Sequence, residues 1–128
     1  MEQTNLLPLG SVVYMKEGIM PLLIVARQPI LKMQEEIYYL DYAAVNQLTG
    51  LNNIEEIAYF NNEDIREILY QGYISENEKT VLTALEEWKQ NNLDIPKGKV
   101  IDLKHTSKKK EYGDLGEKSL LEGETFGF

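Results

Sequence analysis

The sequence predicts an α+β domain, in which a curved, mainly antiparallel sheet of about five strands packs against one amphipathic C-terminal helix. Short β-branched and aromatic runs, separated by Gly, Pro and Asn turn signals, fill residues 11–73. A single segment with helical periodicity follows them. Because consecutive strands pair most easily with their neighbours, we expect a meander with one face covered by the helix.

The strands are expected in chain order, each bounded by turn residues. They cover residues 11–15, 22–27, 36–42, 54–60 and 67–73. The short connection around Gly18 predicts a hairpin between the first two strands. In the third strand, alternation places Asp41 on the same face as Ile37 and Tyr39. Residues 61–64 predict a capped helical turn.

The helix is expected from Glu76 to about Asn92. Ser75 is the candidate N-cap, and Glu78 three residues later has the spacing of a capping box. An apolar stripe recurs at positions i, i+4 and i+7, formed by Val81, Leu85 and Trp88.

A change in composition divides the chain after the helix. Residues 1–96 are expected to form the globular domain, and residues 97–128 a charged, flexible tail that holds five of the nine glycines. Pro96 and Gly98 supply the stop signals at this boundary. The domain has six basic and fifteen acidic residues, and the tail has seven basic and six acidic residues.

Composition excludes several classes of function for the 128-residue chain. The absence of cysteine removes disulfides, thiolate zinc sites and Cys nucleophiles, and the one histidine lies in the charged tail. A net charge of −8 argues against a nucleic-acid binder. No signal peptide or membrane-spanning apolar run is apparent, so a cytoplasmic location is expected. We therefore expect no catalytic residue, no cofactor and no metal.

Tyrosine and acidic side chains are the candidates for a protein-binding surface, because interfaces favour Tyr. The candidate partner-binding residues are Tyr39, Asp41, Tyr42, Glu63, Asp64, Tyr70 and Tyr73. The alternative is that the tyrosines are half-buried strand residues and that Asp41 forms a structural hydrogen bond with a neighbouring residue.

The order of several segments resembles a small bacterial family. The segments are residues 7–18, 22–27, 39–42, 59–65 and 68–73, and the resemblance covers residues 6–90. That family is a domain of unknown function in Gram-positive bacteria, encoded beside type VII secretion toxins of the LXG type. The family pattern usually has Gly and Pro after the Asp-Tyr pair, where this chain has Ala43 and Ala44.

The resemblance implies a non-catalytic cytosolic chaperone or adaptor that binds a type VII secretion toxin or its targeting partner. Charge on an acidic, Tyr-bearing surface would speed that encounter. One alternative is an immunity protein, since the acidic domain suits a basic nuclease toxin. Another is a metal-dependent hydrolase, which requires Asp41 to converge with Glu63 or Asp64. The partner's identity and the oligomeric state are left open.

Overall fold

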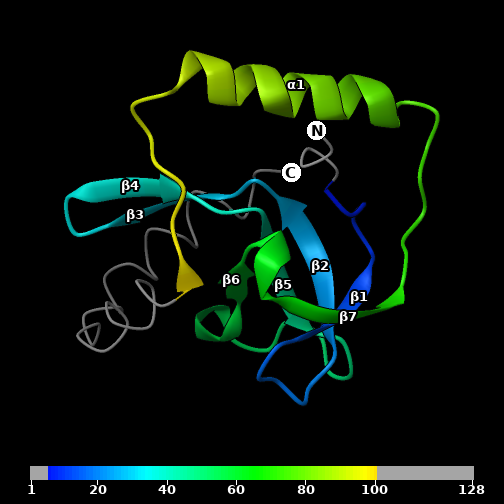
Figure 1. Cartoon of the computed structure of the whole chain (residues 1–128). Helices are drawn as coiled ribbons and strands as arrows, with labels where there is room; N and C mark the ends of the chain where they lie inside the picture. The colour runs from blue at the N-terminus through cyan, green and yellow to red at the C-terminus, as the bar shows by residue number, and fades with distance from the viewer. Residues whose placement is uncertain (1–5, 101–128) are drawn as a thin grey trace.

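The computed structural model describes residues 6–100, which form two antiparallel sheets and one helix (Figure 1). The larger sheet has the order β6-β5-β2-β1-β7, and the smaller one pairs β3 with β4. The strands are β1 (Val12–Met15), β2 (Leu22–Arg27), β3 (Ile30–Met33), β4 (Glu36–Tyr39), β5 (Tyr42–Asn46), β6 (Ala58–Phe60) and β7 (Ile65–Tyr70). The helix α1 spans Glu78–Asn91. The α+β class, the five-strand antiparallel sheet and the helix after the strands are confirmed.

The strand order departs from the expected meander. β1, β2, β5 and β6 pair in succession as expected of a meander, but β7 returns to pair with β1. β3 and β4 leave the sheet between β2 and β5 as a separate hairpin (Figure 1). β3 was not expected; it is a short run that follows Pro29 directly.

Two expected strands are interrupted. The strand over residues 36–42 is broken at Leu40 and Asp41, and its halves belong to different sheets. The expectation that Asp41 shares a strand face with Ile37 and Tyr39 is therefore wrong. The strand over residues 54–60 begins only at Ala58. The Asn53 side chain accepts a hydrogen bond from the Glu55 amide at 3.0 Å and starts a 3-10 turn instead.

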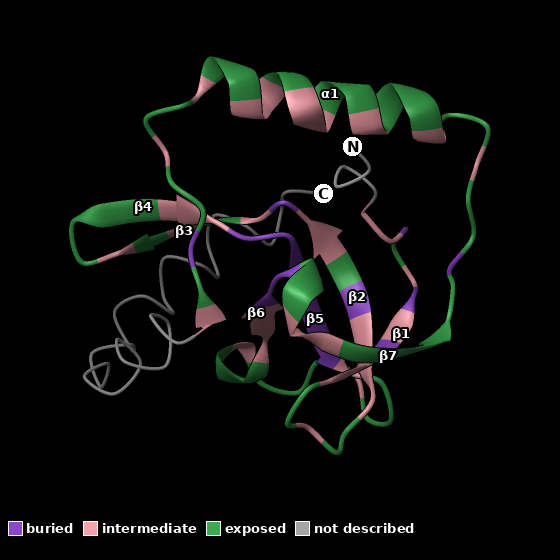
Figure 2. Ribbon diagram, viewed as in Figure 1, coloured by how far each residue is buried: buried purple, intermediate pink, exposed green. Residues whose placement is uncertain are grey.

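The core lies where β1, β2, β5 and β6 meet. Its buried residues are Val13, Ile24, Tyr42, Ala44 and Phe60, and the Tyr42 and Phe60 ring centroids are 5.6 Å apart. β5 is buried along nearly its whole length (Figure 2), because it is an inner strand whose neighbours cover it. Its two alanines allow that close packing.

The helix α1 starts two residues later than expected and lacks the predicted capping box. Ser75 Oγ accepts a hydrogen bond from the Asn77 amide, whereas the Glu78 carboxylate pairs with Arg27 at the end of β2. No residue of α1 is buried. Figures 1 and 2 show the helix crossing the end of β2 instead of lying over the centre of a sheet face. It is too short and too polar to cross a membrane, and it is the only α-helix within residues 6–100.

The described chain continues past the expected boundary at Pro96 and packs on the domain. The Gly98 amide donates to the Tyr39 carbonyl at 2.8 Å, and Tyr39 and Lys97 form a parallel bridge. Gly98 is buried, and Val100 packs against the core. Residues 101–128, the remainder of the expected tail, lie outside the described residues.

We predict that Gly72→Ala destabilises the domain by about 3 kcal/mol, because a Cβ there would overlap backbone. That atom would lie 2.2 Å from the Leu9 carbonyl oxygen and 2.9 Å from the Gly10 carbonyl carbon. Urea unfolding followed by circular dichroism measures the loss. The matched control is Gly50→Ala, which has φ of +81° but open space around its Cβ. It should cost only the left-handed strain of about 1–2 kcal/mol, and equal losses would contradict the overlap.

Candidate functional site

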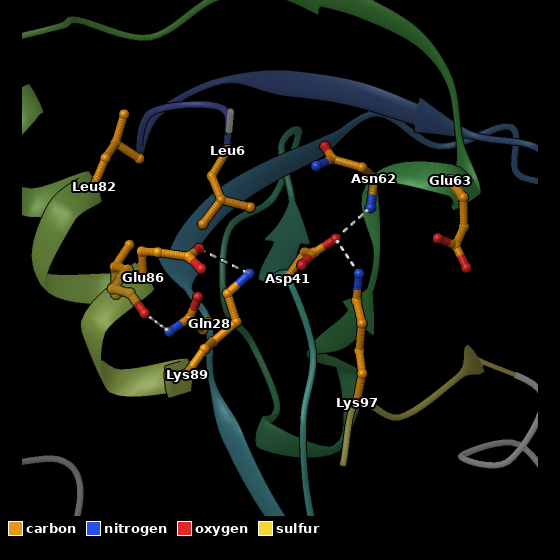
Figure 3. Close-up of a pocket in the computed structure, with 10 residues that line it drawn as sticks. Leu6, Gln28, Asp41, Asn62, Glu63, Leu82, Glu86, Lys89 and Lys97 are labelled. Carbon is orange, nitrogen blue, oxygen red and sulfur yellow. Dashed lines mark hydrogen bonds and ion pairs between the residues drawn. The ribbon is translucent and has the colours of Figure 1, made fainter. Parts of the chain in front are cut away.

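A groove of about 520 Å³ separates α1 from the end of the larger sheet (Figure 3). We call it the α1 groove. Apolar side chains come from Leu82 and Leu85 on α1 and from Leu6. The other lining residues are polar or charged, and they are Gln28, Asp41, Asn62, Glu63, Glu86, Lys89 and Lys97. The groove therefore offers both an apolar wall and fixed charges.

Asp41 is the most constrained residue of the α1 groove. It is 5% exposed, and its Oδ2 accepts a hydrogen bond from the Asn62 amide at 2.9 Å. Lys97 Nζ lies 3.2 Å from the same oxygen (Figure 3). The Asp41 amide donates to Asn61 Oδ1, and its carbonyl accepts from the Gln28 amide. A buried carboxylate needs such partners, since an unpaired one would be strongly unfavourable.

The expected helical turn at residues 61–64 is confirmed as the 3-10 turn η3 (Asn62–Asp64). Asp64 Oδ2 accepts a hydrogen bond from the Asn61 amide at 2.9 Å. The buried Asn61 side chain also donates to the Gly98 carbonyl at 3.0 Å. Asn61 thus joins Asp41 to the 97–100 segment, and the Asp64 carboxylate caps the start of the turn.

Two of the predicted contact tyrosines pack inside the domain. Tyr42 is fully buried, and its hydroxyl accepts from the Leu7 amide and donates to Asn62 Oδ1. A direct partner contact is therefore wrong for Tyr42. Tyr39 is half-buried, with its ring edge-on to Trp88 of α1 at a centroid distance of 5.8 Å.

The remaining predicted residues divide between two surfaces. Glu63 is exposed and lines the α1 groove together with Asp41. Tyr70, at the end of β7, is 64% exposed, and Tyr73 is 82% exposed. Figure 2 shows most of β7 as exposed. The structure therefore brings Asp41 and Glu63 together and leaves the two tyrosines on the β7 side.

The acidic residues do not assemble a metal site within residues 6–100. No group of three His, Asp or Glu side chains in this part of the chain could hold a metal ion. Asp41 is held by Lys97 and Asp64 by the Asn61 amide. Asp41 and Glu63 both line the α1 groove, but within residues 6–100 no third such side chain joins them in a group that could hold a metal ion.

Sequence reasoning missed the residues that close the α1 groove. Gln28 adopts a left-handed φ of 54°, and its Nε2 donates to the Leu85 carbonyl at 3.0 Å. Nothing in the sequence around Gln28 signals this role. Lys97 lies between Pro96 and Gly98, a pattern that indicated only a boundary. Pairing of Lys97 with Asp41 depends on a contact between residues 56 positions apart.

We predict that Asp41→Ala lowers the free energy of unfolding by about 2–3 kcal/mol, because it leaves the Asn62 amide and Lys97 without their acceptor. Chemical denaturation at neutral pH measures the change. Asp94→Ala removes an exposed carboxylate and should stay within about 0.5 kcal/mol of wild type. Equal effects of the two substitutions would contradict a structural role for Asp41.

Alkaline pH should unfold the domain partly through Tyr42. Burial raises the pKa of the Tyr42 hydroxyl from 10.0 to about 12. The folded state therefore holds this proton more tightly than the unfolded chain, and the contribution is complete below pH 10 and lost as pH rises through 12. A shift of this size corresponds to about 3 kcal/mol.

The measurement is the free energy of unfolding from pH 9 to 12 for wild type and Tyr42→Phe. The variant is expected to be less stable at pH 9, because it loses both hydroxyl hydrogen bonds. It should also lose less stability than wild type as pH rises. Parallel curves would show that Tyr42 does not control the alkaline transition.

Comparison with known proteins identifies a family for this chain but no individual relative. No curated protein and no solved structure matches the chain. A family model described as "Domain of unknown function (DUF4176)" matches residues 6–81. This stretch contains all seven strands and ends in the first turn of α1. The chain belongs to the DUF4176 family of domains of unknown function.

Proposed function

We propose that this protein is a non-catalytic cytoplasmic accessory protein, a chaperone or adaptor that binds a type VII secretion toxin of the LXG type or the targeting partner of that toxin. The observation that supports binding is an exposed apolar segment, which we call the β7 surface. It comprises Ile68, Leu69, Tyr70, Tyr73 and Ile74, each at least 42% exposed. Exposed apolar side chains on an outer strand and on the segment that follows it are typical of protein-binding sites, in which Tyr is enriched.

The position of the β7 surface favours a protein partner. β7 is an outer strand, and β1 is its only neighbour among the described strands. Arg66 is exposed, but its guanidinium is directed to the β1–β2 turn, where it donates to two carbonyls, and it lies 4.9 Å from the Tyr14 ring centre. The nearby acids Glu67 and Glu76 are exposed. The surface is therefore apolar and acidic, which suits a partner with basic residues.

The choice of a secretion toxin comes from the sequence resemblance. The segments that carry it include residues 59–65 and 68–73, and the latter contain most of the β7 surface. A toxin kept unfolded or partly folded before export exposes apolar segments, and a small binding domain can cover them.

We predict that Tyr70→Ser with Tyr73→Ser weakens binding to a co-expressed type VII secretion toxin of the LXG type by about thirtyfold or more, as expected when interface anchors are lost. Co-expression and calorimetry of the purified complex measure the affinity. The control, Leu48→Ser with Leu93→Ser, removes apolar side chains that are similarly exposed in other loops. It should bind as wild type does.

Salt provides a second readout for the same complex. Complementary charge predicts that the association rate falls as ionic strength rises from about 0.05 to 0.5 M. No complex with the toxin, or an association rate independent of salt, would contradict the proposal.

A second candidate, an immunity protein, is favoured by the acidic excess of the domain. Residues 6–100 contain fourteen acidic and eight basic residues. An immunity protein would bind the catalytic region of the toxin, whereas an adaptor would bind after that region is deleted. Binding to the truncated toxin supports the adaptor, and its loss supports the immunity protein.

A further inference from the structure

The helix α1 is fastened to the domain at three separate points, one near each end and one between them. Glu78 Oε2 lies 2.5 Å from Arg27 Nη2, in the first turn of the helix. The Leu85 carbonyl accepts from Gln28 Nε2 at 3.0 Å. Near the other end, Trp88 packs edge-on against Tyr39. No residue of α1 is fully buried, and its apolar contact with the domain comes from the half-buried Leu82, Leu85 and Trp88.

The three domain residues that contact α1 are held by hydrogen bonds of their own. Arg27 Nε donates to the Leu7 carbonyl, and its side chain is 8% exposed. Gln28 is 8% exposed, and its amide is bonded to the Asp41 carbonyl. Tyr39 is bonded through its backbone to Pro96 and Gly98. The three groups that hold α1 therefore also have hydrogen-bond partners outside the helix.

These body groups form a receptor for an amphipathic helix. The Arg27 guanidinium accepts an acidic residue in the first turn, and Leu6 offers an apolar contact that Leu82 faces across the groove (Figure 3). On α1 the matching positions are Glu78, then Leu82, Leu85 and Trp88 at four, seven and ten residues further on. This spacing places the four residues on one face of the helix, as in amphipathic helices that bind a partner.

We propose that α1 is displaceable from its seat on Arg27, Gln28 and Tyr39, and that a partner protein places an amphipathic helix with the same spacing on that seat. The bound α1 identifies the occupant, because it shows which acid, leucines and aromatic residue the seat accepts. This seat and the β7 surface are different sites. The inference therefore rests on the proposed function only for the identity of the natural partner.

Competition between the two helices supplies the test. An attached helix acts at an effective concentration in the millimolar range, so a free helix binds wild-type protein weakly. A substitution that weakens only the attached helix raises the open fraction and with it the apparent affinity for the free helix. A purely structural role for α1 predicts no such gain.

The experiment titrates the full chain with a fluorescein-labelled peptide of residues 76–92 and follows anisotropy. We expect Glu78→Gln protein to bind this peptide about fivefold more tightly than wild-type protein. Peptide carrying Glu78→Gln should bind the same variant protein about fivefold more weakly than the natural peptide. Glu87→Gln, on an exposed position of α1, is the control in both protein and peptide and should change neither affinity.

Hydrogen exchange on the full chain gives an independent readout. Amides of α1 should exchange faster than those of β2 and β5, and Glu78→Gln should accelerate exchange in α1 alone. Equal affinity of the peptide for wild-type and Glu78→Gln protein, or α1 amides as protected as those of β5, would overturn the inference. Either result with intact toxin binding through the β7 surface would leave the proposed function standing.

Discussion

The buried carboxylate of Asp41 is the constraint on which the rest of the structure depends. It lies where the chain leaves the β3–β4 hairpin and enters β5, and it binds the Asn62 amide and Lys97. Through its backbone it also holds Asn61 and Gln28. One residue therefore joins the sheet, the turn η3, the segment after the helix and the floor of the α1 groove. A buried charge permits this only when every partner is in place.

The domain consequently has a firm part and a weakly held part. β5 lies inside the sheet, with Tyr42 packed on Phe60 and its hydroxyl satisfied by Leu7 and Asn62. The helix α1 instead contributes half-buried side chains and three point contacts. Elements that open at low free energy are the ones that ligand exchange can use. The firm sheet can then present the β7 surface without change while the helix moves.

The fold was predictable wherever a local pattern carried the signal. The periods of two and 3.6 residues located β1, β2, β7 and α1 to within about two or three residues. They failed at residues 36–42, because an alternating pattern continues across Asp41 even though the chain there turns between sheets. The capping-box spacing at Glu78 also misled, because the Glu78 carboxylate pairs with Arg27 instead of capping the helix. In both cases a partner distant in sequence decides the local structure.

By itself the sequence determined the α+β class, the family and the acidic character of the domain, because these depend on composition and on neighbours along the chain. It also identified Tyr70 and Tyr73 as candidate contacts, although it could not distinguish them from Tyr42, which the core buries. Only the tertiary structure decided the strand order, the pairing of Asp41 with Lys97 and the seat of α1 between Arg27 and Tyr39. Each of these contacts joins residues that are far apart in the sequence. Which polar groups pair depends on which of them the fold buries, because buried polar groups need hydrogen-bond partners.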